Sequence, residues 1–179
     1  MSSKINFRNI VAAHLATLKN FDSGRYRPAD FILFFILPAV AASAALFFGA
    51  NPSDGLQTSL ILFAGLNGVA LVSALTLLLK LANDEHANAC HQTADAPVRR
   101  RLIIETHANV SYSLLVSFLL ATAAVFRAVV EHRAEEAAPS PLRQAATFVC
   151  LYLAANLSLS LLMVLRRLTV LLTRQLEAE

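Results

Sequence analysis

Residues 31–81 read FILFFILPAVAASAALFFGANPSDGLQTSLILFAGLNGVALVSALTLLLKL, and this stretch decides the fold. Its two long apolar runs, Phe31 to Ala50 and Ser59 to Leu79, carry no charged side chain and are separated by the short polar segment Asn51 to Gly55. A helix rises ~1.5 Å per residue, so each run would reach about 30 Å, the thickness of the hydrocarbon core of a bilayer. The stretch therefore predicts a hairpin of two transmembrane helices.

Two further apolar runs, Val110–Val130 and Ala145–Leu165, complete the membrane part. The chain is 56% hydrophobic with a mean hydropathy of +0.57, whereas soluble domains are about 45–50% apolar. No polar segment is long enough for an independent domain. We predict an all-α, integral membrane four-helix bundle that forms one domain over 1–179, with transmembrane helices at 31–50, 57–80, 109–130 and 145–166.

Positive charge is distributed unevenly along the chain. Of the 15 Lys and Arg residues, only three lie on the opposite side: Arg127 near the end of the third run, and Arg133 and Arg143 between the third and fourth runs. The others precede the first run, separate the second from the third or follow the fourth. Cytoplasmic loops retain Lys and Arg. The distribution therefore predicts cytoplasmic N- and C-termini, and it explains the net charge of +3 without nucleic-acid binding.

Amphipathic segments flank the membrane part on the same predicted side. Within 1–30, the apolar residues recur at spacings of three and four and face a basic surface, and they include Phe7, Val11, Leu15 and Leu18. Such a helix suits the lipid interface, and it suits equally well packing on the protein's own cytoplasmic extensions or on a partner. Residues 167–179 predict a cytoplasmic extension of the last helix, whose stripe of Leu168, Leu172 and Leu176 needs cover from the N-terminal helix, a second subunit or a cytoplasmic partner.

Several residues inside the predicted spans bear on packing. Pro38 removes the backbone hydrogen bond to the carbonyl of Phe34, which predicts a kink. Small residues spaced for close helix packing recur on each span. They include Ala41, Ala45 and Gly49 on the first, Ala64 and Gly68 on the second, and Ser113, Ser117 and Ala121 on the third.

Asn67 and Asn156 are the most informative polar residues in the spans. Each lies about eleven residues past the predicted outer end of its helix, so both lie near the midplane of the bilayer and could meet. One interpretation is an interhelical hydrogen bond that holds the bundle together. The other is a hydrated path in an oligomer, lined by these two residues with Ser117, Ser158 and Ser160.

No catalytic or cofactor-binding motif is present. The central parts of the spans carry no charged residue, which disfavours ion-coupled transport, and Arg127 near one end is expected to extend toward the interface. No Ser is paired with a base for intramembrane hydrolysis. His86, Cys90 and His91 offer metal ligands, but no second ligand pair accompanies them. We therefore predict no enzymatic activity and no cofactor.

The run His14 to Asn20, followed by Asp30 to Pro38 and three more spans that end in an Arg-flanked helix, resembles small four-helix membrane proteins of bacterial antiphage defence loci, such as the membrane subunit of the Kiwa system. The resemblance implies a bacterial inner-membrane protein that oligomerises and works with a cytoplasmic partner. It implies either sensing of an insult to the envelope or action on the membrane. The resemblance assigns no functional role to any individual residue.

These observations predict a non-enzymatic inner-membrane sensor or scaffold subunit that oligomerises and docks a cytoplasmic protein. Its partners would be the lipid bilayer, further copies of the chain and that protein. The alternative is an oligomeric pore-forming or membrane-perturbing effector. An uncoupled transporter of small solutes is the third interpretation, and the lack of charge in the spans weakens it.

Overall fold

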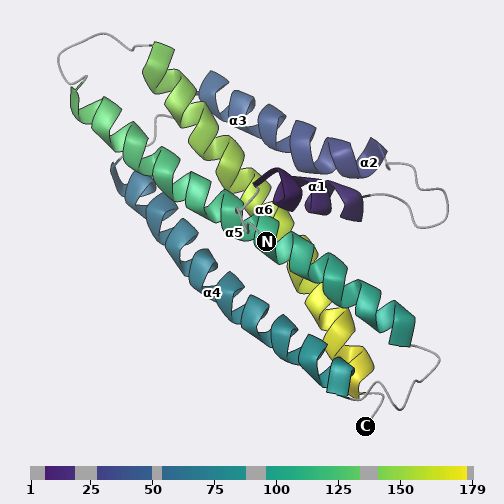
Figure 1. Cartoon of the computed structure of the whole chain (residues 1–179). Coiled ribbons are helices and arrows are strands. Elements are labelled where there is room, and N and C mark those ends of the chain that lie inside the picture. Colours follow the sequence, from purple (N-terminus) through teal and green to yellow (C-terminus); the bar gives the residue numbers. More distant parts are fainter. Residues whose placement is uncertain (1–6, 19–27, 50–53, 88–95, 134–140, 177–179) are drawn as a thin grey trace.

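A computed structural model describes residues 7–18, 28–49, 54–87, 96–133 and 141–176, and its regular elements are all helical (Figure 1). The side chains of residues 54, 84–87, 96, 133 and 174–176 are outside the description. The elements are α1 (Phe7–Thr17), α2 (Pro28–Phe31), the π-helix η1 (Ile32–Ile36), α3 (Leu37–Phe47), α4 (Asp54–Ala87), α5 (Ala96–Arg133) and α6 (Pro141–Leu176). The predicted all-α fold is confirmed.

Four helical segments are long and apolar enough to cross a membrane. They cover Pro28–Phe47, Gly55–Asn83, Pro97–His132 and Pro141–Thr173, each with a mean hydropathy of 2.1 or 2.2 over its most apolar window. The chain is therefore a multi-pass membrane protein. The first segment has 20 residues and spans about 30 Å, but α5 has 38 and spans about 57 Å. Helix α5 therefore extends beyond the hydrocarbon core.

The long helices lie in the order α3, α6, α5, α4 (Figure 1). Helix α5 packs against both α4 and α6, and α6 packs against α3. Within the described ranges, α3 and α4 do not contact each other. The two predicted spans of the opening stretch therefore follow each other in sequence but do not pack against each other.

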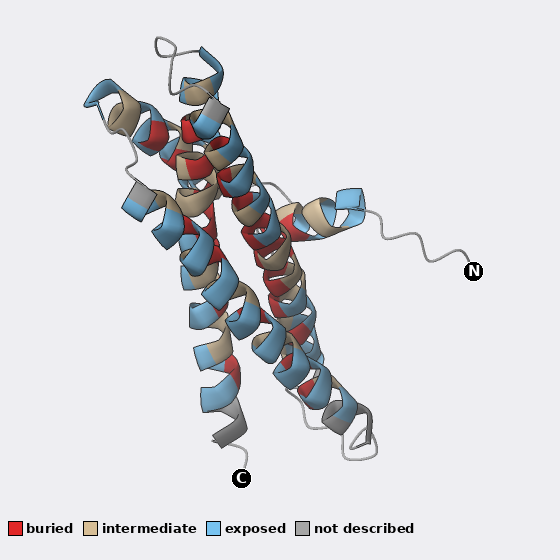
Figure 2. Cartoon of the chain, turned by 90° about the vertical axis from the view of Figure 1, so that its left-hand side faces the viewer, coloured by how far each residue is buried: buried red, intermediate tan, exposed pale blue. Residues whose placement is uncertain are grey.

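The core lies on both sides of α5. Leu71 and Leu78 of α4 and Leu157 of α6 are buried in the same apolar cluster as Val110 and Leu120 of α5. Figure 2 shows the buried residues along the inner faces of the long helices and the exposed ones on their outer faces. Because the exposed residues on these faces include many large apolar side chains, the outer faces suit contact with lipid tails.

Close helix packing occurs where the second and third spans carry small residues. Ser117 Oγ donates to the carbonyl oxygen of Ala64 at 2.6 Å, and a Cβ on Gly68 would lie 3.5 Å from the same Oγ. The small residues predicted on these two helices therefore do bring α4 and α5 together. On the first span, the buried residues are Phe34, Pro38 and Ala42, in place of the predicted Ala41, Ala45 and Gly49.

Charged side chains mark two levels along the helices. At one level, Arg101 and Arg167 both bind Glu105, and at the other, Arg127 and Arg143 both bind Glu131. Along α5, Arg101 and Arg127 are about 39 Å apart at ~1.5 Å per residue. This separation fits a bilayer of about 30 Å of hydrocarbon between headgroup regions. We call the level of Arg101, Glu105 and Arg167 the basic end.

Candidate functional site

Helix α1 packs against α5 near the basic end and lies across the long helices (Figure 2). Its contact centres on His14, whose exposed fraction is 0%. The imidazole stacks on the ring of Tyr112 with the centroids 3.8 Å apart and the planes 1° from parallel. The ring of Phe34 meets the imidazole edge to face at 5.9 Å. His14 therefore joins α1 to both α5 and the start of the first span.

The buried ring of His14 is neutral at pH 7. Burial lowers the pKa of His14 to about 4; the hydrogen bond with Asn109 opposes this shift, and the positive charge of Arg167 adds to it. Nδ1 lies 2.8 Å from Asn109 Oδ1, and because an amide oxygen only accepts, Nδ1 carries the proton. Nε2 is then an unprotonated acceptor, and in the described part of the chain no donor reaches it.

The surroundings of His14 are polar but incompletely paired. Thr17 Oγ1 lies 2.9 Å from Asn109 Oδ1 and 2.7 Å from the carbonyl oxygen of His14. Two buried side-chain atoms of this contact, His14 Nε2 and Asn109 Nδ2, have no hydrogen-bond partner in the described ranges. Each such atom costs about 1–3 kcal/mol. The contact that holds α1 on α5 is therefore weaker than an apolar contact of the same size would be.

Asn156 links three helices beside this contact. Its Oδ1 accepts from the hydroxyl of Tyr112 at 3.1 Å, and its Nδ2 donates to the carbonyl oxygen of Phe34 at 2.7 Å. That carbonyl lies four residues before Pro38, which has no N–H to offer it. The helix widens to η1 there, with the N–H of Leu37 bonded to the carbonyl of Ile32. The side chain of Asn156 thus supplies the donor that proline removes.

An ion cluster and a cleft adjoin α1 at the basic end. Glu105 accepts from Arg101 Nε at 2.8 Å and from a terminal guanidinium nitrogen of Arg167 at 3.0 Å. The other terminal nitrogen of Arg167 lies 3.5 Å from the carbonyl oxygen of Thr17. Beside them is a cleft of about 970 Å³ between the end of α1, residues Asp30 and Phe34, and helices α5 and α6. Its apolar lining consists of Leu18, Phe34, Pro97, Val98, Leu102, Met163 and Val170.

Asn67 and Asn156 do not meet within the chain. The side chain of Asn67 donates to the carbonyl of Phe63 in its own helix at 2.6 Å. Asn156 bonds instead to Tyr112 and Phe34. The predicted hydrogen bond between helices exists, but its partners are different.

The three serines proposed with these asparagines have separate surroundings. Ser117 is buried and bonds α5 to α4. Ser158 is exposed and bonds to the carbonyl of Ala154 in its own helix. Ser160 is buried, and its hydroxyl has no partner in the described ranges. These positions do not bring the proposed lining residues onto one surface.

The amphipathic stripes are only partly covered. On α1, Leu18 is buried, Val11 and Leu15 are partly buried and Phe7 is 60% exposed. On α6, Leu168 packs against the core cluster and Leu172 is 44% exposed, and the side chain of Leu176 lies outside the description. Because α1 packs against α5, it does not provide the cover proposed for the stripe on α6.

Arg127 does not extend to solvent as expected. Its side chain is 1% exposed and pairs with Glu131 at 2.8 Å. Nε donates to Thr147 and a terminal nitrogen donates to Gln57. The guanidinium therefore links α4, α5 and α6 at the end opposite α1. Sequence reasoning missed this role because Gln57 is 70 residues away along the chain.

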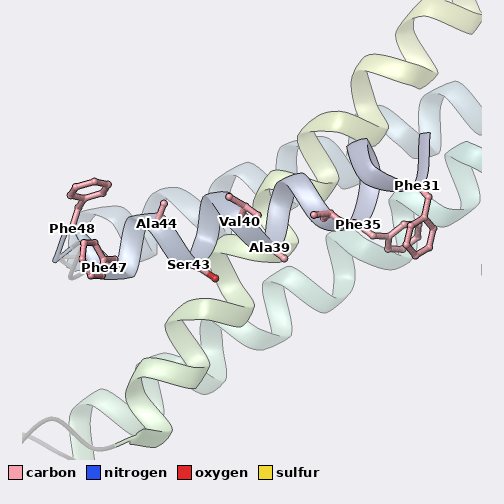
Figure 3. A pocket seen from close by; sticks show the side chains of 9 residues that line it. Phe31, Phe35, Ala39, Val40, Ser43, Ala44, Phe47 and Phe48 are labelled. Atoms are coloured by element: carbon pink, nitrogen blue, oxygen red, sulfur yellow. The ribbon is translucent and has the colours of Figure 1, made fainter. Parts of the chain in front are cut away.

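Helix α3 carries an apolar groove of about 750 Å³ on its outer face. Figure 3 shows Phe31 and Phe35 at one end and Phe47 and Phe48 at the other, with smaller side chains between them. Such a face suits lipid tails or another transmembrane helix.

The described residues contain no group of three or more His, Cys, Asp or Glu side chains placed to hold a metal ion. The side chains of His86, Cys90 and His91 lie outside the description. No family model, curated protein or solved structure matches the chain. The candidate site is thus the junction of α1 with α5 and α6, together with the adjoining cleft.

Proposed function

We propose that this protein is a non-enzymatic sensor or scaffold subunit of a bacterial inner membrane, with the basic end in the cytoplasm. The observation that carries the proposal is the docking of α1 on the membrane helices through a buried but incompletely paired polar contact around His14. Such a contact makes α1 the element most easily displaced when the surrounding membrane or a bound partner changes. The distribution of Lys and Arg supports the orientation.

A docking surface for a soluble partner is supported by an exposed apolar residue beyond the charged level. Leu172 is 44% exposed, and it lies more than one turn beyond Arg167 on α6. Lipid tails do not reach past the headgroups. A cytoplasmic protein or a second copy of the chain would cover this residue. The resemblance of the sequence to defence-locus proteins supports a role in antiphage defence.

The alternative of an oligomeric pore draws less support from the geometry. Asn156 and Ser117 use their hydrogen-bonding groups inside one chain, and Asn67 and Ser158 bond to their own helices. An assembly that conducts ions would need these groups on a shared, hydrated surface.

The proposal is tested by capturing the protein from its native host in nanodiscs and measuring the mass and composition of the complex. We expect an oligomer with a stoichiometric soluble partner that is lost in a Leu172→Glu variant. Leu142→Glu is the matched control, because Leu142 is 53% exposed but lies at the other end of α6. A homo-oligomer that contains no soluble protein, combined with conductance in a planar bilayer, would favour the pore.

A further inference from the structure

The described lining of the cleft beside α1 contains more basic than acidic side chains. It includes Arg101, Arg166 and Arg167 together with Asp30 and Glu105. Glu105 is shared between Arg101 and Arg167. In the described part of the chain, no carboxylate lies within ion-pair distance of the exposed Arg166. The guanidinium of Arg166 therefore suits an anionic ligand in the cleft.

The position and lining of the cleft favour a phosphate that belongs to a lipid. The arginines lie at the level of the bilayer headgroups, about 39 Å along α5 from the opposite charged level at ~1.5 Å per residue. Apolar side chains, including Leu18, Leu102 and Met163, line the rest of the cleft. Its volume of about 970 Å³ is far larger than an inorganic phosphate needs and suits a headgroup with the start of its acyl chains.

We propose that this cleft binds the headgroup phosphate of an anionic phospholipid of the adjacent leaflet. Arg166 and Arg101 donate to the phosphate oxygens, since a guanidinium presents paired N–H groups that match this geometry. Arg167 stays bound to Glu105 and to the carbonyl of Thr17. Because Thr17 and Leu18 form one wall, a bound lipid also stabilises the docked position of α1.

The inference requires a membrane protein but no soluble partner, so it can fail or hold independently of the proposed scaffold function. Native mass spectrometry of the purified protein measures lipid binding, with phosphatidylglycerol and phosphatidylcholine of identical acyl chains as the probes. We expect phosphatidylglycerol to bind about tenfold more tightly than phosphatidylcholine, since each basic residue near an anionic lipid adds a severalfold preference. Inorganic phosphate in millimolar excess should leave the bound lipid in place.

The deciding variant is Arg101→Gln combined with Arg166→Gln, which should reduce the preference to less than about twofold. The matched control is Lys80→Gln with Arg100→Gln, which removes the same charge from exposed residues at the same end that do not line the cleft. If the double variant aggregates, Arg166→Gln alone replaces it, because Arg166 lies on the surface. The proposal is overturned if both lipids bind equally, if the control loses as much preference as the cleft variant, or if inorganic phosphate displaces the lipid.

Discussion

Acidification should release α1 from the membrane helices, because docking requires a neutral His14. The pKa of His14 is about 4 in the docked state, against an ordinary value of 6.5. Between these two values the undocked ring binds a proton that the docked ring does not. Docking is therefore fully stable above about pH 6.5 and loses stability as the pH falls toward 4. The loss is about 1.4 kcal/mol per pH unit, or about 3 kcal/mol in total.

Double electron–electron resonance in nanodiscs measures the docked fraction. Spin labels on Ala12 of α1 and Ile104 of α5 suit the experiment, because both residues are exposed. We expect one narrow distance distribution at pH 7.5. Below pH 6.5 a broad component should grow, with the ratio of docked to undocked protein falling about tenfold per pH unit.

Three controls separate His14 from its neighbours. A His14→Phe variant retains a flat ring against Tyr112 but has no group to protonate, so its docked fraction should not follow this slope. Any slope that remains in this variant does not come from His14. A variant lacking the exposed His107 and His132 should titrate like the parent. A docked fraction that stays constant from pH 7.5 to 4, or an equal slope in His14→Phe, would refute the reasoning.

Two further predictions concern the stability of the helical core, measured by unfolding in mixed micelles. Asn156→Leu should lower the free energy of unfolding by about 1–3 kcal/mol, because it leaves the hydroxyl of Tyr112 and the carbonyl of Phe34 without partners. Asn67→Leu should lower it by less than about 0.5 kcal/mol. In a Pro38→Ala background the loss of stability caused by Asn156→Leu should fall by about half, because alanine restores a backbone N–H for the carbonyl of Phe34. An unchanged loss would contradict the role given to Asn156. Arg127→Gln should cost about 2–3 kcal/mol, because it leaves partners of a buried guanidinium unpaired. Arg143→Gln, on a partly exposed residue, should cost less than about 1 kcal/mol, and equal losses for the two variants would contradict the burial of Arg127.

The presence of four long apolar helices was predictable because hydropathy and length determine it. The order of the helices was not, since it depends on which side-chain surfaces fit together. Residues 31–81 gave two adjacent spans, yet α3 packs against α6 and α4 against α5. A short connection in sequence therefore did not make α3 and α4 neighbours.

The apolar helix that carries a polar residue was similarly easier to predict than the direction in which that side chain points. Asn67 and Asn156 were correctly identified as polar residues inside the spans, but only Asn156 points into the core. The lost bond at Pro38 was predicted, whereas the donor that replaces it lies 122 residues away along the chain.

His14 was missed as a site residue although a signal was present. It lies between Ile10 and Leu18 at spacings of four, which places an ionisable side chain on the apolar stripe of residues 7–18. Its hydrogen-bond partner Asn109 is 95 residues away, so no local pattern identifies the pair. A histidine on an apolar stripe of an interfacial helix is a useful indication of such a contact.

The central claim is that a soluble protein docks at the basic end, and photo-crosslinking in the native host tests it most directly. A photoreactive amino acid at Leu172 is compared with one at Leu142, at the opposite end of α6. The account predicts one soluble protein crosslinked at position 172 and none at position 142. Crosslinks to lipid alone at position 172, or the same soluble protein at both positions, would contradict it.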